Sequence, residues 1–543
     1  MLLCAFLLFW IRHVSPGEIT WNVATYIYMG KTILEGGIPY RDAFDVKGPG
    51  IYYIFAFTML LFGKTTLGIE ILEGVWQAVT ALILFRIGAR IYQRETAGYA
   101  AASVYLIYLL YFATRGGTAE PDRLVALPMG LGILFLLDAG EEDRLWSWTL
   151  AGLTMAAAAL LKLPAALLGA VMMVAAVRQD PARFGRIGLR LAALAAGFLT
   201  PLLFCALWFY LHGALGDLWT AQFKFAPQYL RSFNAWGSPA CLGRSFTITM
   251  LFPLYAMGGL ALLRVQSTGR KAWRWPEGSV LAWVFVAALS LFLHGLFFSY
   301  HFFPLAAPLA LLSGRAIAGW REERTPVRLA TVALGLLFLI LPIVKVPSFL
   351  FASMRAPGEE RAGADAWWRT LAISLRARTT PEDTVFLWAN VPQFYLDVDR
   401  KSPSRFFHSI YLSSEWPGLG THAQFLADLR ARPPKFFAVN KAGLIGSPCP
   451  FSQLDYYAAF RGFAELQRFL EAEYVLEQET LRYTLYRRKD VAAPAARRGP
   501  LGLEDDRLAV RGASVDGVGD LHGAQAVVTR CGGCALAGGG ANE

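Results

Sequence analysis

A short polar segment, residues 36–50, lies between apolar stretches of the chain and is rich in glycine, proline and charge. Arg41 and Lys47 are its cations. Charged side chains close to a bilayer cost free energy, so those that occur there usually have a function. The glycines allow the backbone to approach a ligand closely. The segment therefore predicts a site for a negatively charged group, with Lys47 on a phosphate.

The residues before and inside this segment complete a candidate binding loop. Helical spacing would place Asn22, Tyr26 and Gly30 on one face of a helix that leads into it. The candidate side chains are Glu18, Asn22, Tyr26, Tyr40, Arg41, Asp42 and Asp45. The competing interpretation is a solvated interfacial loop whose aromatic residues lie at headgroup depth.

A second polar segment contains Glu120 and Asp122 and opens another apolar stretch. Two carboxylates at the start of a helix are compatible with helix capping, because the helix dipole favours negative charge there. They are also the residue type that general acid–base chemistry uses. Both interpretations stay open from the residues alone.

Apolar stretches of this chain must position these residues. The chain has 543 residues, of which 55% are hydrophobic and only 17% charged, against about 25% charged in a soluble domain. An apolar run of about 20 residues crosses a bilayer. The expected fold is an α-helical polytopic membrane protein with about 11 transmembrane helices, at 1–12, 66–89, 97–113, 123–139, 146–161, 163–178, 188–211, 245–263, 277–298, 302–318 and 329–349.

Two apolar stretches fit this scheme less well. Residues 51–62 are too short to span and are predicted to lie along the interface or to re-enter it. Residues 1–12 are also short for a full span, and they lack the basic start and the cleavage site of a signal peptide.

Basic residues predict the orientation. They collect around residues 86–94, 178–190, 264–274 and 315–328, which the segmentation places on one side. Short basic loops mark the cytoplasm, and this accounts for the formal net charge of +11 without nucleic acid as a partner. The first polar loop, residues 13–65, then faces the opposite side.

The sequence beyond residue 349 has a different pattern, with shorter apolar runs and interleaved polar residues. It predicts a transmembrane domain over 1–349 and a small periplasmic α/β domain over 350–490. The expected strands are 383–389 and 435–440, and the expected helices are 363–377, 420–431 and 453–472.

Residues 491–543 are rich in alanine, glycine and arginine and predict a disordered tail. The six cysteines show no disulfide framework. Cys531 and Cys534 have the spacing of a metal or redox pair, but they lack a second ligand pair and a redox-fold context.

Several sequence patterns resemble one group of bacterial membrane glycosyltransferases. Tyr26-x-Tyr28-x-Gly30-Lys31, Gly37-x-Pro39-Tyr40-Arg41-Asp42 and Asp45-x-Lys47-Gly-Pro49-Gly are similar to the first periplasmic loop of GT-C fold enzymes of the protein-mannosyltransferase and aminoarabinose-transferase-like type, which is related to family 39. Trp388-Ala-Asn390-x-Pro392 and Arg400-Lys-Ser-Pro403 resemble the outer domain of these transferases.

The resemblance implies roles for particular residues. A polyprenyl-phosphate sugar is the donor, and Lys47 meets its phosphate. Lys162, Tyr300 and His301 are further candidates for donor-phosphate contact; a snorkelling lysine and an interfacial anchor are the alternatives. Members of the group keep an acidic residue near the acceptor, which points to Glu120 first and to Asp122 second.

One position departs from the pattern. The acidic residue that begins the first loop in this group falls on Asn22, and an amide cannot act as a general base. Losing such a base typically costs about 10²–10⁴ in rate. Glu18 one turn upstream, a different register and a weak or inactive member are the three explanations.

The expected function is transfer of a sugar from a polyprenyl-phosphate donor to a periplasmic glycolipid, polysaccharide or protein, by a multi-pass protein of the inner membrane. No cofactor and no metal are expected, because the group includes metal-independent members. A lipid-linked sugar transporter or flippase and an inactive glycolipid-binding relative are the alternatives. A transporter is expected to show internal repeats, which this sequence does not display.

Overall fold

The structure is a computed structural model of the chain. It describes residues 20–63, 66–113, 119–142, 144–178, 184–233, 235–236, 238–243, 252–267, 275–322, 325–355, 367–441 and 454–492. The expected span 1–12, Glu18, Cys531, Cys534 and all but the first two residues of the expected tail lie outside these ranges.

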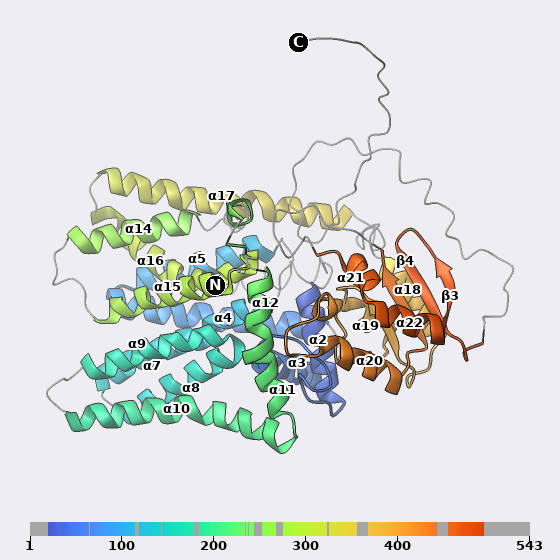
Figure 1. Cartoon of the computed structure of the whole chain (residues 1–543). Helices are drawn as coiled ribbons and strands as arrows, with labels where there is room; N and C mark the ends of the chain where they lie inside the picture. Colours follow the sequence, from blue (N-terminus) through green and yellow to red (C-terminus); the bar gives the residue numbers. More distant parts are fainter. Residues whose placement is uncertain are drawn as a thin grey trace, which may run out of the picture.

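Long apolar helices form one half of the molecule and lie side by side (Figure 1). They are apolar around most of their circumference, as helices are when one face packs in a bundle and the other meets lipid. They are α4 (Thr66–Tyr92), α5 (Glu95–Ala113), α7 (Ala126–Glu142), α8 (Leu145–Leu161), α9 (Leu167–Arg178), α10 (Phe184–Leu211), α14 (Phe252–Ser267), α15 (Trp275–His294), α16 (Phe303–Ala318) and α17 (Thr325–Arg355). The short helix α6 (Pro121–Leu124) directly precedes α7.

Within the described part of the chain, five helices are long and apolar enough to cross a membrane. They are Thr66–Tyr92, Pro121–Glu142, Arg186–Leu211, Glu277–His294 and Ser299–Ala318. Shorter apolar helices occur at Pro49–Phe62, Leu145–Leu161, Leu163–Val174 and Thr325–Ile340. The expected polytopic helical class is confirmed, and the number of eleven spans stays a prediction.

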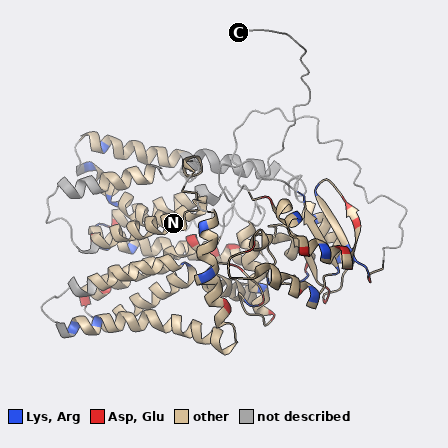
Figure 2. Cartoon of the chain, viewed as in Figure 1, with Lys and Arg blue, Asp and Glu red and all other residues tan. Residues whose placement is uncertain are grey.

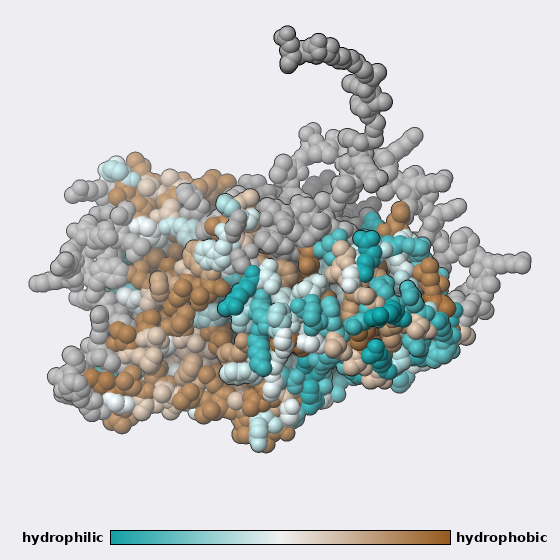
Figure 3. All heavy atoms as spheres, in the orientation of Figure 1, coloured by the Kyte–Doolittle hydropathy of each residue, from teal (hydrophilic) through white to brown (hydrophobic). Residues whose placement is uncertain are grey.

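Exposed side chains agree with a lipid-facing surface on this half. On α10, Leu203 is 63% exposed and Phe204 is 69% exposed. Figure 3 shows hydrophobic residues over the visible face of the helical half and hydrophilic ones over the opposite end of the molecule. Burying such side chains in hydrocarbon removes the cost of their contact with water.

The basic side chains near the helix ends are not confined to loops, contrary to the expectation. Arg86 and Arg90 lie within α4, and Arg186 and Arg190 lie within α10. A long arginine side chain in the first or last turns of a helix can extend to the headgroup region, so its charge does not require the helix to end.

The described part of the expected loop 13–65 is largely helical, and it includes the predicted helix that carries Asn22, Tyr26 and Gly30. It contains α2 (Trp21–Leu34) and α3 (Pro49–Phe62). Thr20 caps α2, since its hydroxyl oxygen accepts a hydrogen bond from the backbone N–H of Val23 at 3.3 Å. Pro49 occupies the first position of α3, where a missing N–H costs nothing.

The C-terminal part is an α/β unit with a four-stranded sheet in the order β1-β2-β4-β3. Strands β1 (Val385–Trp388) and β2 (Phe436–Asn440) pair in parallel, and β4 (Tyr483–Arg488) pairs antiparallel with β2 and with β3 (Tyr474–Glu479). The helices are α18 (Trp367–Ala377), α19 (Gln393–Val398), α20 (Thr421–Ala431), α21 (Tyr456–Gly462) and α22 (Ala464–Glu473). Both expected strands and the described parts of the three expected helical stretches are confirmed, with 453–472 divided into α21 and α22. Residues 363–366 and 453 lie outside the described residues, and the β3–β4 hairpin was not predicted.

One hydrophobic core joins this unit to the first polar loop. Phe44 from that loop, Phe225 from the segment after α10, and Tyr411 and Trp416 from the C-terminal part all belong to it. The segment after α10 comprises α11 (Leu215–Trp219), the π-helical turn η2 (Thr220–Phe225) and α12 (Ala226–Phe233). The half of the molecule that contains the sheet, called the outer half below, is therefore assembled from three separate stretches of the chain. In Figure 1 its helices α2, α3, α19 and α20 lie next to one another.

Charge follows the same division of the molecule. Figure 2 shows acidic and basic residues gathered in the outer half and near the ends of the long helices, with few in their middle. The long helices have a separate hydrophobic core of their own. Charged residues that lie where the two halves meet therefore stand out, and these are described next.

Candidate active site

Lys47 lies where the two halves meet, directly before α3, and three side chains fix its backbone. Tyr40 donates its hydroxyl to the Lys47 carbonyl oxygen at 2.7 Å, and Gln222 donates to the same oxygen at 3.0 Å. The Lys47 N–H donates to the Tyr52 hydroxyl at 3.1 Å. The first turn of α3 adds partial positive charge, because its leading N–H groups have no partner within the helix. This end of the loop is therefore rigid and electropositive.

Among the described residues, the ammonium group of Lys47 forms an ion pair with Asp45. Its Nζ lies 3.8 Å from Oδ1 of Asp45, and the Lys47 side chain is 27% exposed while that of Asp45 is 3% exposed. Burial raises the pKa of Asp45, but the Lys47 charge and hydrogen bonds from Tyr411 and Tyr52 outweigh it, so the pKa lies below its ordinary value. A separation of 3.8 Å is too long for a hydrogen bond, so the N–H donors of Lys47 stay available to a ligand.

Gly48 and Gly50 bring this loop against the end of helix α8. A Cβ atom at Gly48 would lie 2.2 Å from the carbonyl oxygen of Leu160, and one at Gly50 would lie 3.0 Å from it. The sequence predicted that the glycines admit a ligand. In the structure these two glycines admit the backbone of α8 instead, which places Lys47 close to the start of the turn at Lys162.

Glu120 is the buried carboxyl group of the site. It is 1% exposed and accepts a hydrogen bond from the Tyr26 hydroxyl at 2.9 Å. Asn22 lies within hydrogen-bonding reach of it. Glu120 occupies the N-cap position of α6 but makes no side-chain capping hydrogen bond. The capping interpretation is therefore not supported, because the carboxyl group faces α2 instead.

The environment of Glu120 favours its protonated form. Burial raises the pKa of Glu120 to about 7, and the neighbouring Asp122 also raises it, while Lys47, Tyr26 and Asn22 act in the opposite direction. A carboxyl group of this kind exchanges its proton near neutral pH, which is what a general acid or base requires.

Strained backbone surrounds the same groups. Ala119, directly before Glu120, has a φ of 45°, Tyr40 has a φ of 70°, and Phe297 has a φ of 49°. Positive φ is uncommon outside glycine, and such residues cluster at functional sites where the surrounding structure holds them in place.

Asp122 and Lys162 form a buried ion pair with each other. Their side chains are 8% and 6% exposed, so Lys162 does not snorkel to the surface. The ammonium of Lys162 is thus already engaged by a carboxylate, in contrast to that of Lys47. Arg123 of the same short helix forms a second buried ion pair, with Glu73 at 2.7 Å. The sequence analysis did not predict this pair.

Tyr300 and His301 lie in the 3₁₀ turn η4 (Ser299–Phe302) that precedes α16. Tyr300 is within hydrogen-bonding reach of Asn22. The His301 ring lies 4.5 Å from the Tyr300 ring and 5.2 Å from that of His294. His301 is buried, and its Nδ1 has no hydrogen-bond partner among the residues that the structure describes. It is therefore a polar atom that a ligand could satisfy.

Two of the predicted loop residues lie apart from this group. Arg41 pairs with Asp42 at 2.8 Å, and their side chains are 41% and 38% exposed. Arg41 also donates to the carbonyl oxygen of His212, and Asp42 accepts from the N–H of Ile38. These contacts hold the turn in shape and bring neither side chain to Glu120.

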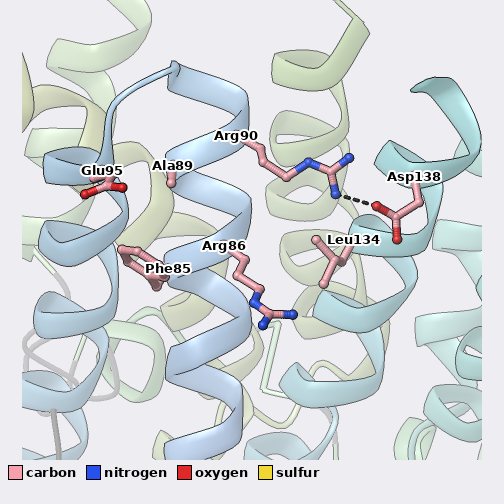
Figure 4. Close-up of a pocket in the computed structure, with 7 residues that line it drawn as sticks. All are labelled: Phe85, Arg86, Ala89, Arg90, Glu95, Leu134 and Asp138. Carbon is pink, nitrogen blue, oxygen red and sulfur yellow. Dashed lines mark hydrogen bonds and ion pairs between the residues drawn. The ribbon is translucent and has the colours of Figure 1, made fainter. Parts of the chain in front are cut away.

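A pocket of about 250 Å³ lies elsewhere on the bundle (Figure 4). Its walls include Arg86 and Arg90 of α4 and Asp138 of α7, and Arg90 pairs with Asp138 at 2.5 Å. Glu120 and Asp138 are at opposite ends of the α6–α7 rod, about 25 Å apart at a rise of 1.5 Å per residue. This pocket is not part of the site.

Comparison with a solved structure identifies the fold. The structure of ArnT from Cupriavidus metallidurans bound to undecaprenyl phosphate superposes with a TM-score of 0.53 at 13% identity, covering 91% of this chain and 98% of that one. Residues 46–210 match the family described as dolichyl-phosphate-mannose-protein mannosyltransferase. This stretch includes Lys47, Glu120, Asp122 and Lys162. The chain therefore has the GT-C fold.

Sequence relatives indicate which class of membrane transferase the chain resembles. The undecaprenyl phosphate-alpha-4-amino-4-deoxy-L-arabinose arabinosyl transferase of Pseudomonas paraeruginosa is 28% identical over 377 residues, which cover 66% of this chain and 66% of that relative. A Pseudomonas fluorescens transferase of the same kind is 25% identical over 290 residues, covering 50% of this chain and 48% of that relative. The matches thus span at most about two thirds of these curated relatives. Within the GT-C fold, the chain is similar to transferases of the protein-mannosyltransferase and aminoarabinose-transferase type, the resemblance that the first polar loop indicated.

Proposed function

We propose that this protein is a membrane glycosyltransferase that moves a sugar from a polyprenyl-phosphate donor to a hydroxyl group of a cell-envelope acceptor. One arrangement carries the proposal: Glu120, a buried carboxyl group whose pKa burial raises to about 7, lies in the electrostatic field of Lys47, whose N–H donors have no hydrogen-bond partner among the described residues. The activity for which the relatives are named and the undecaprenyl phosphate bound to ArnT support the donor class.

The reaction divides between these two groups. The acceptor oxygen attacks the anomeric carbon, its proton passes to the Glu120 carboxylate, and the bond between the sugar and the phosphate oxygen breaks. Lys47 and the first turn of α3 stabilise the charge of the departing lipid phosphate, and His301 can donate a hydrogen bond to it. In this scheme Glu120 is the base, and the role of Asn22 is to orient it.

We place the site on the periplasmic side of the inner membrane. The basic residues of α4 and α10 gather at the helix ends that lie away from the candidate site. The positive-inside rule assigns those ends to the cytoplasm. Cys241, in the segment after α12, is disulfide-bonded, although the spacing of the cysteines indicated no framework, and a disulfide fits an oxidising compartment. Glycolipid, polysaccharide and protein all remain acceptor classes for this site.

A transfer assay tests the function. Membrane vesicles with and without the protein are supplied with a polyprenyl-phosphate sugar labelled in the sugar, and the label is followed by mass analysis of envelope glycans, lipids and proteins. A glycosyltransferase attaches the label covalently to an acceptor and releases unlabelled polyprenyl phosphate. A flippase would move the intact labelled lipid across the bilayer without either product, and that outcome would contradict the proposal.

Gly48→Ala is expected to impair transfer strongly, because the new Cβ would meet the Leu160 carbonyl oxygen at 2.2 Å and displace the Lys47 loop from α8. A geometric error of about 1 Å costs roughly 10² in rate, and the same variant should unfold at a lower temperature. Gly74→Ala on α4 is the matched control, since nothing lies within 4 Å of its added Cβ. Equal activity of the two variants would show that the close approach is not required.

Asn22→Asp separates the orienting role from the missing-base explanation. A second carboxylate within reach of Glu120 disfavours ionisation of both, so we expect slower transfer at pH 7 and a rate profile displaced by about one unit to higher pH. The missing-base explanation expects a gain in activity instead. Initial rates measured between pH 6 and pH 9 distinguish the two.

A further inference from the structure

Asp45 is a carboxylate taken almost completely out of water, and its contacts come from two distant stretches of the chain. Tyr52 of α3 donates its hydroxyl to Oδ2 at 2.8 Å. Tyr411 of the C-terminal unit donates its hydroxyl to Oδ1. A buried charge needs both hydrogen bonds and a counter-charge, and here Lys47 supplies the counter-charge from 3.8 Å.

This arrangement has a consequence for Lys47. A carboxylate without other donors would draw the ammonium into a short, charge-assisted hydrogen bond of about 2.8 Å. The two tyrosine hydroxyls instead satisfy one lone pair on each Asp45 oxygen, and the lysine stays 3.8 Å away with its charge balanced. The backbone of Lys47 cannot follow the carboxylate, because Tyr40 and Gln222 hold its carbonyl oxygen.

The side chain of Tyr411 is held in one position beside Asp45. It lies in the 3₁₀ turn η7 (Ser409–Leu412) and is 3% exposed. Its ring packs edge-on against Phe44 and Phe225, with centroids 5.1 Å and 5.3 Å apart. Trp416 donates its indole N–H to the Tyr411 carbonyl oxygen at 3.0 Å. Few rotamers are open to a ring held in this way, so its hydroxyl has a set position relative to Asp45.

We propose that Tyr411 is a positioning residue through which the C-terminal unit completes the phosphate site: it holds Asp45 so that Asp45 balances the charge of Lys47 without using its hydrogen-bond donors. This inference rests on the proposed function of Lys47. It assigns the C-terminal unit a direct part in binding the donor, besides any part in binding the acceptor.

The test compares Tyr411→Phe with Tyr474→Phe. Tyr474 is also buried in the C-terminal unit, and its hydroxyl donates to the Pro434 carbonyl oxygen at 2.7 Å, remote from Asp45. Losing a hydrogen bond to a charged group typically weakens an interaction roughly tenfold to a hundredfold. We therefore expect Tyr411→Phe to weaken binding of polyprenyl monophosphate and to raise the KM for the donor by such a factor, and Tyr474→Phe to change neither.

A double-mutant cycle identifies the route of the effect. In an Asp45→Asn background Tyr411 has no carboxylate to hold, so adding Tyr411→Phe should change donor binding less than twofold beyond Asp45→Asn alone. Thermal unfolding of each variant reports whether it is folded. Should Tyr411→Phe not fold, Tyr52→Phe, which removes the other hydroxyl from Asp45, is compared with Tyr474→Phe in the same way.

Three results would overturn the inference. The first is donor binding by Tyr411→Phe equal to that of Tyr474→Phe, and the second is an undiminished loss in the Asp45→Asn background. Both leave the proposed function intact, because wild-type binding and transfer are unaffected. The third is wild-type protein that neither binds polyprenyl monophosphate nor transfers sugar, which refutes the proposed function itself.

Discussion

Lys47→Ala is expected to abolish measurable sugar transfer while folded protein stays in the membrane. The lipid phosphate gains negative charge as it departs, and a fixed cation in a site shielded from water stabilises that charge far more than bulk water does. Removing one such group typically costs about 10²–10³ in rate. Binding of polyprenyl monophosphate should weaken as well, because in the proposed mechanism Lys47 contacts the phosphate before and during the reaction.

The variant also disturbs a buried charge, which must be separated from catalysis. Without Lys47, Asp45 stays buried and loses its counter-charge, and such a loss is strongly destabilising. The double variant Lys47→Ala with Asp45→Asn removes both charges, so we expect it to recover thermal stability but not transfer. Lys401→Ala is the matched control: its ammonium pairs with Glu35 at 2.9 Å and is 60% exposed. Wild-type turnover by folded Lys47→Ala would contradict the assignment.

Much of the site could be predicted because its residue types are costly in an apolar chain. Lys47, Glu120 and Asp122 are charged residues beside membrane helices, and such residues need a function or a partner. The structure brings Glu120 to Tyr26 and Asp122 to Lys162, across spacings that no local periodicity specifies. Residue type thus indicated which side chains matter, and only the fold showed how they pair.

Other parts of the site left no local signal. Tyr411 and Gln222 stand in ordinary aromatic and helical contexts, and they reach the Lys47 loop only because three distant stretches share one core. Composition changes near residue 349, but helix α17 (Thr325–Arg355) continues past that residue, so composition did not mark the end of this helix. A turn residue such as Gly48 is recognisable from sequence, but whether it admits a ligand or a neighbouring helix depends on what packs against it.

Glu120→Gln is expected to slow transfer by about 10²–10⁴, the usual contribution of a general base. The amide keeps the size of the side chain and can still bond to Tyr26, so substrate binding should change little and the loss should fall on kcat. Glu415→Gln is a control, because that side chain is 48% exposed and contacts His422 in the C-terminal unit. A Glu120→Gln variant with wild-type kcat would assign the base elsewhere, with Glu18 the next candidate.

The pH dependence of the wild-type protein provides an independent check on Glu120. Its pKa is raised from the usual 4.5 to about 7, so a base in this position is protonated and inactive below that pH. The transfer rate should rise as the pH passes through about 7 and then level off, and Glu120→Gln should lack this dependence.

Folding stability should change in the opposite direction. Between pH 4.5 and 7 the folded state holds a proton that the unfolded state has released, so stability falls as the pH rises. Thermal unfolding of wild type and Glu120→Gln over the same range would show this fall only in the wild type, because the amide does not titrate.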